Sequence, residues 1–204
     1  MSLFPLPDDF YGEPIVEQKA AQINLFLANI IMEAFSEAGL SAGIVGGYAR
    51  DTFFGVAPKD LDICVAVNSV TDDEVEALLD RVQQVLWSNT RFAGFDPDYT
   101  VCGMYNDHAS DRACGVLQFK DYGIDVIFYR DCSNVQEIID AFDFNINQFA
   151  LNGFLQPIYL GSTDLRQLIA VRNDASVERC VKVMGKHSNL LPAITAAYSD
   201  GRLV

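Results

Sequence analysis

Two aspartates and the residues around them carry the groups that phosphate chemistry requires. The segment from Gly43 to Val65 reads GIVGGYARDTFFGVAPKDLDICV. Asp60 and Asp62 lie two residues apart in a run typical of a buried strand, so strand alternation would place both carboxylates on one face. Neighbouring carboxylates repel each other, and a divalent cation relieves that repulsion. The spacing therefore indicates a Mg²⁺ or Mn²⁺ site that shares the ion with water and phosphate oxygens.

A double glycine supplies the second half of such a site. Gly46 and Gly47 end one apolar run and precede a short helical stretch, so the backbone there can approach a phosphate with no Cβ in the way. Arg50 follows within one helical turn. A second interpretation is that the aspartates are solvated at the start of a strand and the glycines only make a turn. The ordered pair of patterns, G-G-x-x-R-D and then K-D-x-D, is more restrictive and favours phosphoryl transfer.

The elements that must position these residues alternate between helical and extended patterns. Apolar residues recur at helical spacing over 16–40 and over 71–87, where Thr71 and Glu74 form a cap signal. Short β-branched runs predict strands, including a hairpin that turns at residues 121–123. A helix capped by Ser133 is expected next.

This interleaving predicts an α+β (mixed α/β) fold, with a small mixed β-sheet flanked by helices. We expect a head domain over residues 1–170 and a short helical C-terminal extension over residues 171–204, packed on the same domain.

Composition limits the possible partners. The chain has 204 residues and a net charge of −14, from 14 Lys and Arg against 28 Asp and Glu. This balance argues against an extended nucleic-acid surface, while a local basic pocket stays possible. The chain has no bilayer-length apolar run and no secretory leader pattern, and its five cysteines lack C-x-x-C spacing. These features favour a cytoplasmic protein with reduced thiols and no zinc site or membrane partner.

The motifs resemble the signature of the template-independent tRNA nucleotidyltransferases, the CCA-adding enzymes and bacterial poly(A) polymerases of the DNA polymerase β-like superfamily. Two later segments add to the resemblance. GIDVIFYR is similar to the family strand that brings a further acidic group toward the metals, and DFNINQFALNG is similar to the family's D-F-T-I-N segment. The resemblance implies a polymerase β-like nucleotidyltransferase fold. It also implies transfer of an NMP from an NTP to a hydroxyl, with release of pyrophosphate.

The resemblance implies roles for the matching residues. Asp60 and Asp62 would hold the catalytic Mg²⁺ ions, and Asp125 would be a third carboxylate beside them, although a simple turn role for Asp125 is equally open. Asp143 and Asn147 also fit a polar edge strand that bonds only nearby backbone. The residues implied to bind the nucleotide are Gly46, Gly47, Arg50, Lys59, Asp143, Asn147, Arg179 and Lys182.

The chain departs from the family pattern at several points. Ala141 and Phe142 stand where the family has two arginines, so one source of charge for the triphosphate is missing. The helix that carries E-D-x-x-R in the family reads SVERCVKVMGK, which leaves the base preference open. The sequence also stops near the point where the family's tRNA-gripping domains would begin. Together with the acidic charge, this predicts no tight binding of full-length tRNA.

We therefore expect a head-only, Mg²⁺-dependent nucleotidyltransferase whose acceptor is a small molecule, a protein or an RNA end. One alternative is a catalytically degenerate nucleotide-binding or protein-interaction module on the same fold. Another is an RNA 3′-end nucleotidyltransferase that acts with a partner. The missing arginine pair favours the degenerate module, and the intact GG…RD…KDLD pattern favours the enzyme.

Overall fold

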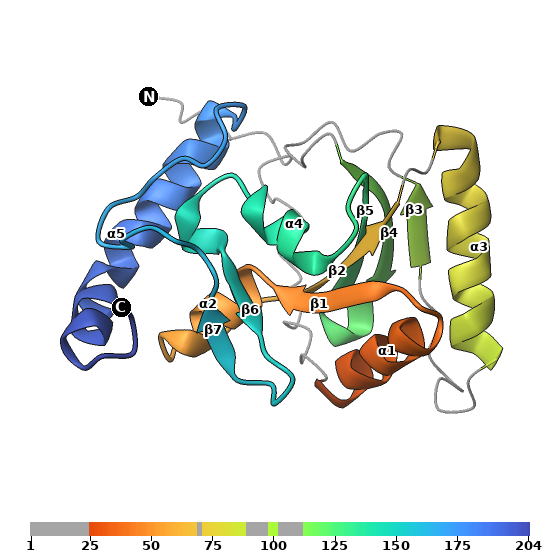
Figure 1. The fold of residues 1–204 in the computed structure, drawn as a ribbon, viewed down its shortest axis with the longest axis horizontal. Helices are drawn as coiled ribbons and strands as arrows, with labels where there is room; N and C mark the ends of the chain where they lie inside the picture. Colours follow the sequence, from red (N-terminus) through yellow and green to blue (C-terminus); the bar gives the residue numbers. More distant parts are fainter. Residues whose placement is uncertain (1–24, 69–70, 89–97, 102–111) are drawn as a thin grey trace, which may run out of the picture.

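The computed structural model describes residues 25–68, 71–88, 98–101 and 112–204 (Figure 1). Its helices are α1 (Leu25–Glu37), α2 (Gly47–Phe53), α3 (Asp72–Ser88), α4 (Val135–Asp140) and α5 (Val177–Ser199), with short 3-10 turns η3 (Lys120–Tyr122) and η4 (Asn145–Asn147). Its strands are β1 (Ser41–Val45), β2 (Leu61–Val67), β3 (Asp98–Val101), β4 (Ala113–Phe119), β5 (Ile124–Arg130), β6 (Phe149–Leu151) and β7 (Pro157–Tyr159).

These strands form one mixed sheet in the order β3-β4-β5-β2-β1-β6-β7. β2 and β5 run parallel, whereas the other neighbours pair antiparallel. The predicted α+β fold, a mixed sheet flanked by helices, is thus confirmed. The hairpin between β4 and β5 turns where the sequence predicted, at η3 and Gly123.

Helix boundaries differ from the predictions in two places. The first helix is described from Leu25 to Glu37, and the part of its predicted range before residue 25 lies outside the described residues. The cap of α4 is Asn134, whose side chain accepts from the backbone N–H of Glu137, so the prediction of Ser133 was wrong by one position. Ser and Asn both cap helices well, so residue type alone does not decide between the two positions.

The central strand β2 distributes its side chains between two cores. Leu61, Ile63 and Val65 join the large core that α1 and α3 cover. Cys64 and Ala66 point to the other face and pack in a smaller core with α4. Because strand side chains alternate, Asp62 shares the α4 face with Cys64. β2 therefore has one apolar face and one face that carries the aspartate.

The last helix, α5, packs its apolar side on α2 and on the segment around η4. Val183, Leu190 and Ile194 of α5 join Ala49 and Phe149 in a third core. Figure 1 shows α5 beside α2 and β7, at the end of the molecule opposite α3. Within the described ranges, none of the helices has the length and apolarity needed to cross a membrane.

Candidate functional site

The double glycine and the aspartates lie on adjoining strands. Val45 at the end of β1 pairs with Asp62 of β2, so the turn that starts at Gly46 lies beside the aspartate. Gly46 has φ 73°, a left-handed backbone conformation that residues other than glycine rarely adopt. Its backbone N–H donates to the carbonyl oxygen of Phe149 at 2.8 Å. Gly46 therefore contributes conformation to the site, and Gly47 leaves the approach to the turn free of a Cβ.

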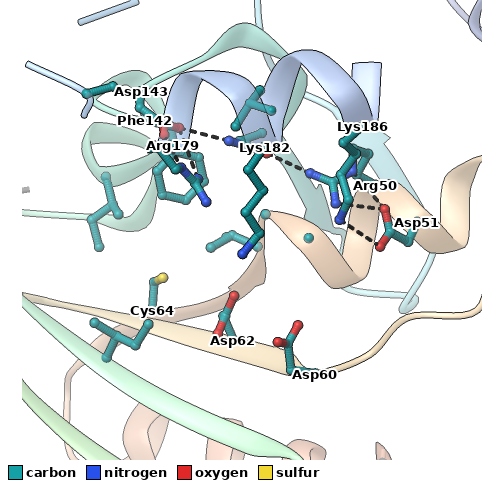
Figure 2. A pocket seen from close by; sticks show the side chains of 18 of the residues that line it. Arg50, Asp51, Asp60, Asp62, Cys64, Phe142, Asp143, Arg179, Lys182 and Lys186 are labelled. Atoms are coloured by element: carbon teal, nitrogen blue, oxygen red, sulfur yellow. Dashed lines mark hydrogen bonds and ion pairs between the residues drawn. The ribbon is translucent and has the colours of Figure 1, made fainter. Parts of the chain in front are cut away.

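A cavity of about 1040 Å³ opens over this turn and gathers residues from distant parts of the chain. The predicted site residues that line it are Gly46, Gly47, Arg50, Lys59, Asp60, Asp62, Asp143, Asn147, Arg179 and Lys182. Asp125 is not part of the lining, although it pairs in register with Asp62 across the parallel β2–β5 ladder. We call Gly46, Gly47, Asp60 and Asp62 the aspartate wall. We call Arg179, Lys182 and Lys186 of α5 the α5 wall, which faces the aspartate wall across the cavity (Figure 2).

The aspartate wall concentrates negative charge. Burial, followed by the charges of Asp60 and Asp125, raises the pKa of Asp62 to about 7, although Arg179 and Arg50 oppose the shift. Burial also raises the pKa of Asp125, against a hydrogen bond from Gln118. Asp60 is exposed and Asp62 is half-buried. The pair is therefore accessible from the cavity and would be stabilised by a cation.

Arg50 is a buried structural cation. Only 2% of it is exposed. Its Nε donates to Asp51 Oδ1 at 2.8 Å and its Nη1 donates to Asn147 Oδ1 at 2.6 Å. The family resemblance placed Arg50 among the nucleotide-binding residues; in the structure its guanidinium lines the cavity and donates to Asp51 and Asn147.

Asn147 extends this network to α5. Its Nδ2 donates to Asp143 Oδ1 at 2.8 Å, and Arg179 Nε donates to Asp143 Oδ2 at 2.5 Å. Burial opposes the ionisation of Asp143, but the bonds from Arg179 and Asn147 outweigh it and hold the pKa of Asp143 below its usual value. Asn147 lies in the buried turn η4, so the interpretation of this segment as a polar edge strand was wrong.

Three basic residues that line the cavity were not predicted from the sequence: Arg112, Arg172 and Lys186. Lys186 follows Arg179 and Lys182 at helical spacing, a signal that the sequence contained. Arg112 and Arg172 follow no motif. Among the described residues, the cavity lining holds seven Lys and Arg: Arg50, Lys59, Arg112, Arg172, Arg179, Lys182 and Lys186. Five carboxylates from the same described ranges line it as well: Asp51, Asp60, Asp62, Asp143 and Asp174. In the described part of a chain of net charge −14, the cavity lining therefore carries more basic than acidic side chains.

The carboxylates of Asp60 and Asp62 suit a hard divalent cation that takes its other ligands from water or substrate, rather than a metal ion coordinated by protein side chains alone. No group of three or more His, Cys, Asp or Glu side chains placed to hold a metal occurs in the described part of the chain. Two carboxylates with mutual repulsion match Mg²⁺, which commonly uses one or two carboxylates and takes its other ligands from water and substrate phosphates.

The chain matches one protein-family model and is similar to several solved structures at low sequence identity. Residues 17–170 match the model of the Gabija anti-defense 2 family protein. No curated protein matches the sequence. A solved structure of a CCA-adding enzyme with ATP is 18% identical, with a TM-score of 0.47, over 78% of this chain and 36% of that one. The Thermotoga maritima CCA-adding enzyme complexed with tRNA is 18% identical, with a TM-score of 0.47, over 81% and 37%.

A third structure, the Bacillus stearothermophilus CCA-adding enzyme in complex with CTP, is 18% identical with a TM-score of 0.44, over 71% of this chain and 32% of that one. The chain thus spans about a third of the length of these structures. The family that matches is therefore not the tRNA nucleotidyltransferase family that the motifs resemble. The chemistry of the site rests on the chain's own residues.

Proposed function

The chain belongs to the Gabija anti-defense 2 family, and from that premise we propose that it is a Mg²⁺-dependent nucleotidyltransferase that takes an NTP into the cavity between the aspartate wall and the α5 wall. The observation that carries the proposal is that carboxylates and basic side chains face each other across one cavity. Asp62 on β2 and Asp60, directly before that strand, face a helix that presents three cations. A nucleoside triphosphate with its metal ion needs both, because the ion binds carboxylates while phosphate oxygens bind cations.

Each part of the aspartate wall has a task in this proposal. Asp60 and Asp62 hold the divalent ion, which neutralises phosphate charge and lowers the pKa of an acceptor hydroxyl when it is bound. Gly47 lets the triphosphate approach the backbone closely. Arg50, held by Asp51 and Asn147, keeps the turn in place. Asp125 lies one strand away from Asp62 and helps to keep the negative potential high where the ion binds.

The site residues do not specify which molecule accepts the NMP. The family's name describes action against a defence called Gabija, which supports protein components of that defence as acceptors. Small molecules with a free hydroxyl and RNA 3′ ends are the other classes. The acidic surface weighs against a long nucleic acid, because binding a phosphate backbone requires many Lys and Arg contacts.

A label-transfer assay tests the proposal. The protein is incubated with Mg²⁺, each α-³²P-labelled NTP in turn, and three acceptor sets: Gabija proteins, tRNA and small hydroxyl compounds. We expect Mg²⁺-dependent label on one set and release of pyrophosphate, both lost with Asp60→Asn and with Asp62→Asn. Tight binding of Mg²⁺ and NTP with no label and no pyrophosphate from any set would contradict transfer. That result would favour the nucleotide-binding module.

A further inference from the structure

The α5 wall is a regular row of cations on one side of a helix. Arg179, Lys182 and Lys186 are three and four residues apart, so successive side chains lie about one turn apart on the same face. Val183 and Leu190 on that side are buried, and they fix the rotation of the helix over the cavity. The row therefore extends about 10 Å along the cavity, given a rise of about 1.5 Å per residue.

The two outer cations of the row are paired with carboxylates outside α5. Arg179 Nε lies 2.5 Å from Asp143 Oδ2. Lys186 Nζ lies 3.4 Å from Asp51 Oδ2, and Asp51 also pairs with Arg50. Burial and then the charge of Arg50 lower the pKa of Lys186, while Asp51 opposes that shift. Both outer cations thus hold α5 to other segments, one to residue 143 before η4 and the other to α2.

Lys182, the middle cation, differs from its neighbours. Its side chain is exposed and lines the cavity, and Figure 2 shows it extending from α5 toward the side where Asp62 and Asp60 lie. Within the residues that the structure describes, its ammonium group makes no ion pair and no hydrogen bond.

Taking the proposed function as its basis, we propose that Lys182 binds a phosphate of the NTP directly, and that Arg179 and Lys186 are positioning residues that hold α5 over the aspartate wall. This division of roles supplies from a C-terminal helix the positive charge that Ala141 and Phe142 do not carry. An ammonium group with three free donors suits a phosphate that already shares its charge with a metal ion.

Calorimetric titration with two probes tests the role of Lys182. The probes are ATP and inorganic tripolyphosphate, each with Mg²⁺, and the variants are Lys182→Gln and Lys182→Arg. The matched control is Arg81→Gln, which removes one positive charge from an exposed position on α3. We expect Lys182→Gln to weaken both probes by about 10- to 100-fold, the usual cost of a lost charged hydrogen bond. Lys182→Arg should stay within about threefold of wild type, and the control should not change.

Thermal unfolding separates binding from positioning. We expect Lys182→Gln to melt within about 1 °C of wild type in the absence of nucleotide, because no partner in the described structure is lost. A clear drop in melting temperature would make Lys182 a structural residue and overturn the inference.

The remaining outcomes are distinct. Wild-type protein that binds neither probe would overturn the proposed function and the inference together. Wild-type binding that Lys182→Gln leaves unchanged would overturn the inference alone. If Lys182→Gln weakens ATP but not tripolyphosphate, the lysine contacts the nucleoside and the phosphate assignment is wrong.

Discussion

The two walls of the cavity are built in different ways. The aspartate wall comes from one continuous segment, in which the β1–α2 turn and β2 lie side by side through strand pairing. The α5 wall comes from a helix more than 110 residues later, and it is held in place by core packing and two ion pairs. Local backbone geometry thus fixes the acidic groups, whereas tertiary contacts place the cations that face them.

This difference suggests that one wall determines the reaction and the other determines how strongly the NTP is bound. The aspartates and glycines are the groups that a reaction of an NTP with a metal ion requires, and a short motif can encode them. The cations set how strongly a triphosphate is bound, and any element that reaches the cavity can supply them. We therefore expect changes in the aspartate wall to stop the reaction, and changes in the α5 wall to weaken binding or loosen the helix.

The largest expected effect lies in the aspartate wall. Asp62→Asn should lower the rate of label transfer from an NTP by about 1000-fold, because it removes a metal ligand without changing the size of the side chain. The fold should be kept or slightly stabilised, since the substitution removes one of two repelling charges. Transfer is measured with α-³²P-labelled NTP and stability by urea unfolding. Wild-type turnover in the Asn variant would disprove the role of the aspartate pair.

Arg50 provides the next test, since it supports the aspartate wall from inside the protein. Arg50→Met should lower the free energy of unfolding by about 3 kcal/mol, because Asp51 stays buried after its main partner is removed. The double variant Arg50→Met/Asp51→Leu is the control and should recover part of the loss. Urea unfolding measures both variants. A loss below about 1 kcal/mol in the single variant would show that the network does not hold the turn.

Much of the fold could be predicted from the sequence because its signals are local. The β4–β5 hairpin has strand patterns on both sides of a turn that ends at Gly123, whose φ is 60°. The helix that starts after Thr71 has a Glu three residues later, and Glu74 Oε2 accepts from the Thr71 backbone N–H at 2.9 Å. The cap of α4 was predicted at Ser133 and lies at Asn134, because both residue types cap helices well and the sequence does not show which of them the chain brings to the first turn.

The part of the site that could be predicted from the sequence is the part formed by one continuous segment. Asp60, Asp62 and the glycines stand close in the sequence, and the pairing of Val45 with Asp62 brings the glycine turn beside the aspartates. Lys186 shares the helical spacing of Arg179 and Lys182, so the sequence contained a signal for it, but which side of α5 faces the cavity is decided by the packing of Val183 and Leu190 on distant residues. Asp143 was predicted to line the nucleotide pocket; the structure adds that its oxygens accept from Asn147, four residues later, and from Arg179, 36 residues later.

The pH dependence of stability gives a smaller, specific effect of the aspartate wall. The pKa of Asp62 is raised from 3.8 to about 7, so the folded protein favours the protonated acid. Its contribution is therefore complete below about pH 4 and is lost as the pH rises through 7. Between pH 5.5 and pH 8 in EDTA we expect the free energy of unfolding to fall by about 1–2 kcal/mol.

Asp62→Asn should flatten this part of the pH profile, and saturating Mg²⁺ should reduce the slope, because the ion stabilises the ionised form. Urea unfolding across the pH series is the measurement. An equal slope in wild type and in the Asn variant would show that another group controls stability in this range.

The smallest expected effects belong to the ion pairs that hold α5. Arg179→Met should cost about 1 kcal/mol of unfolding free energy, because the pair with Asp143 is partly buried and hydrogen-bonded. Lys186→Met should cost about 0.5 kcal/mol, since its side chain is 40% exposed and Asp51 keeps Arg50 as a partner. Urea unfolding ranks the two variants, and amide hydrogen exchange should show faster opening of α5 than of β2 in both. If Lys186→Met proves more damaging than Arg50→Met, α5 is not the loosely held wall, and the contrast between the two sides of the cavity is wrong.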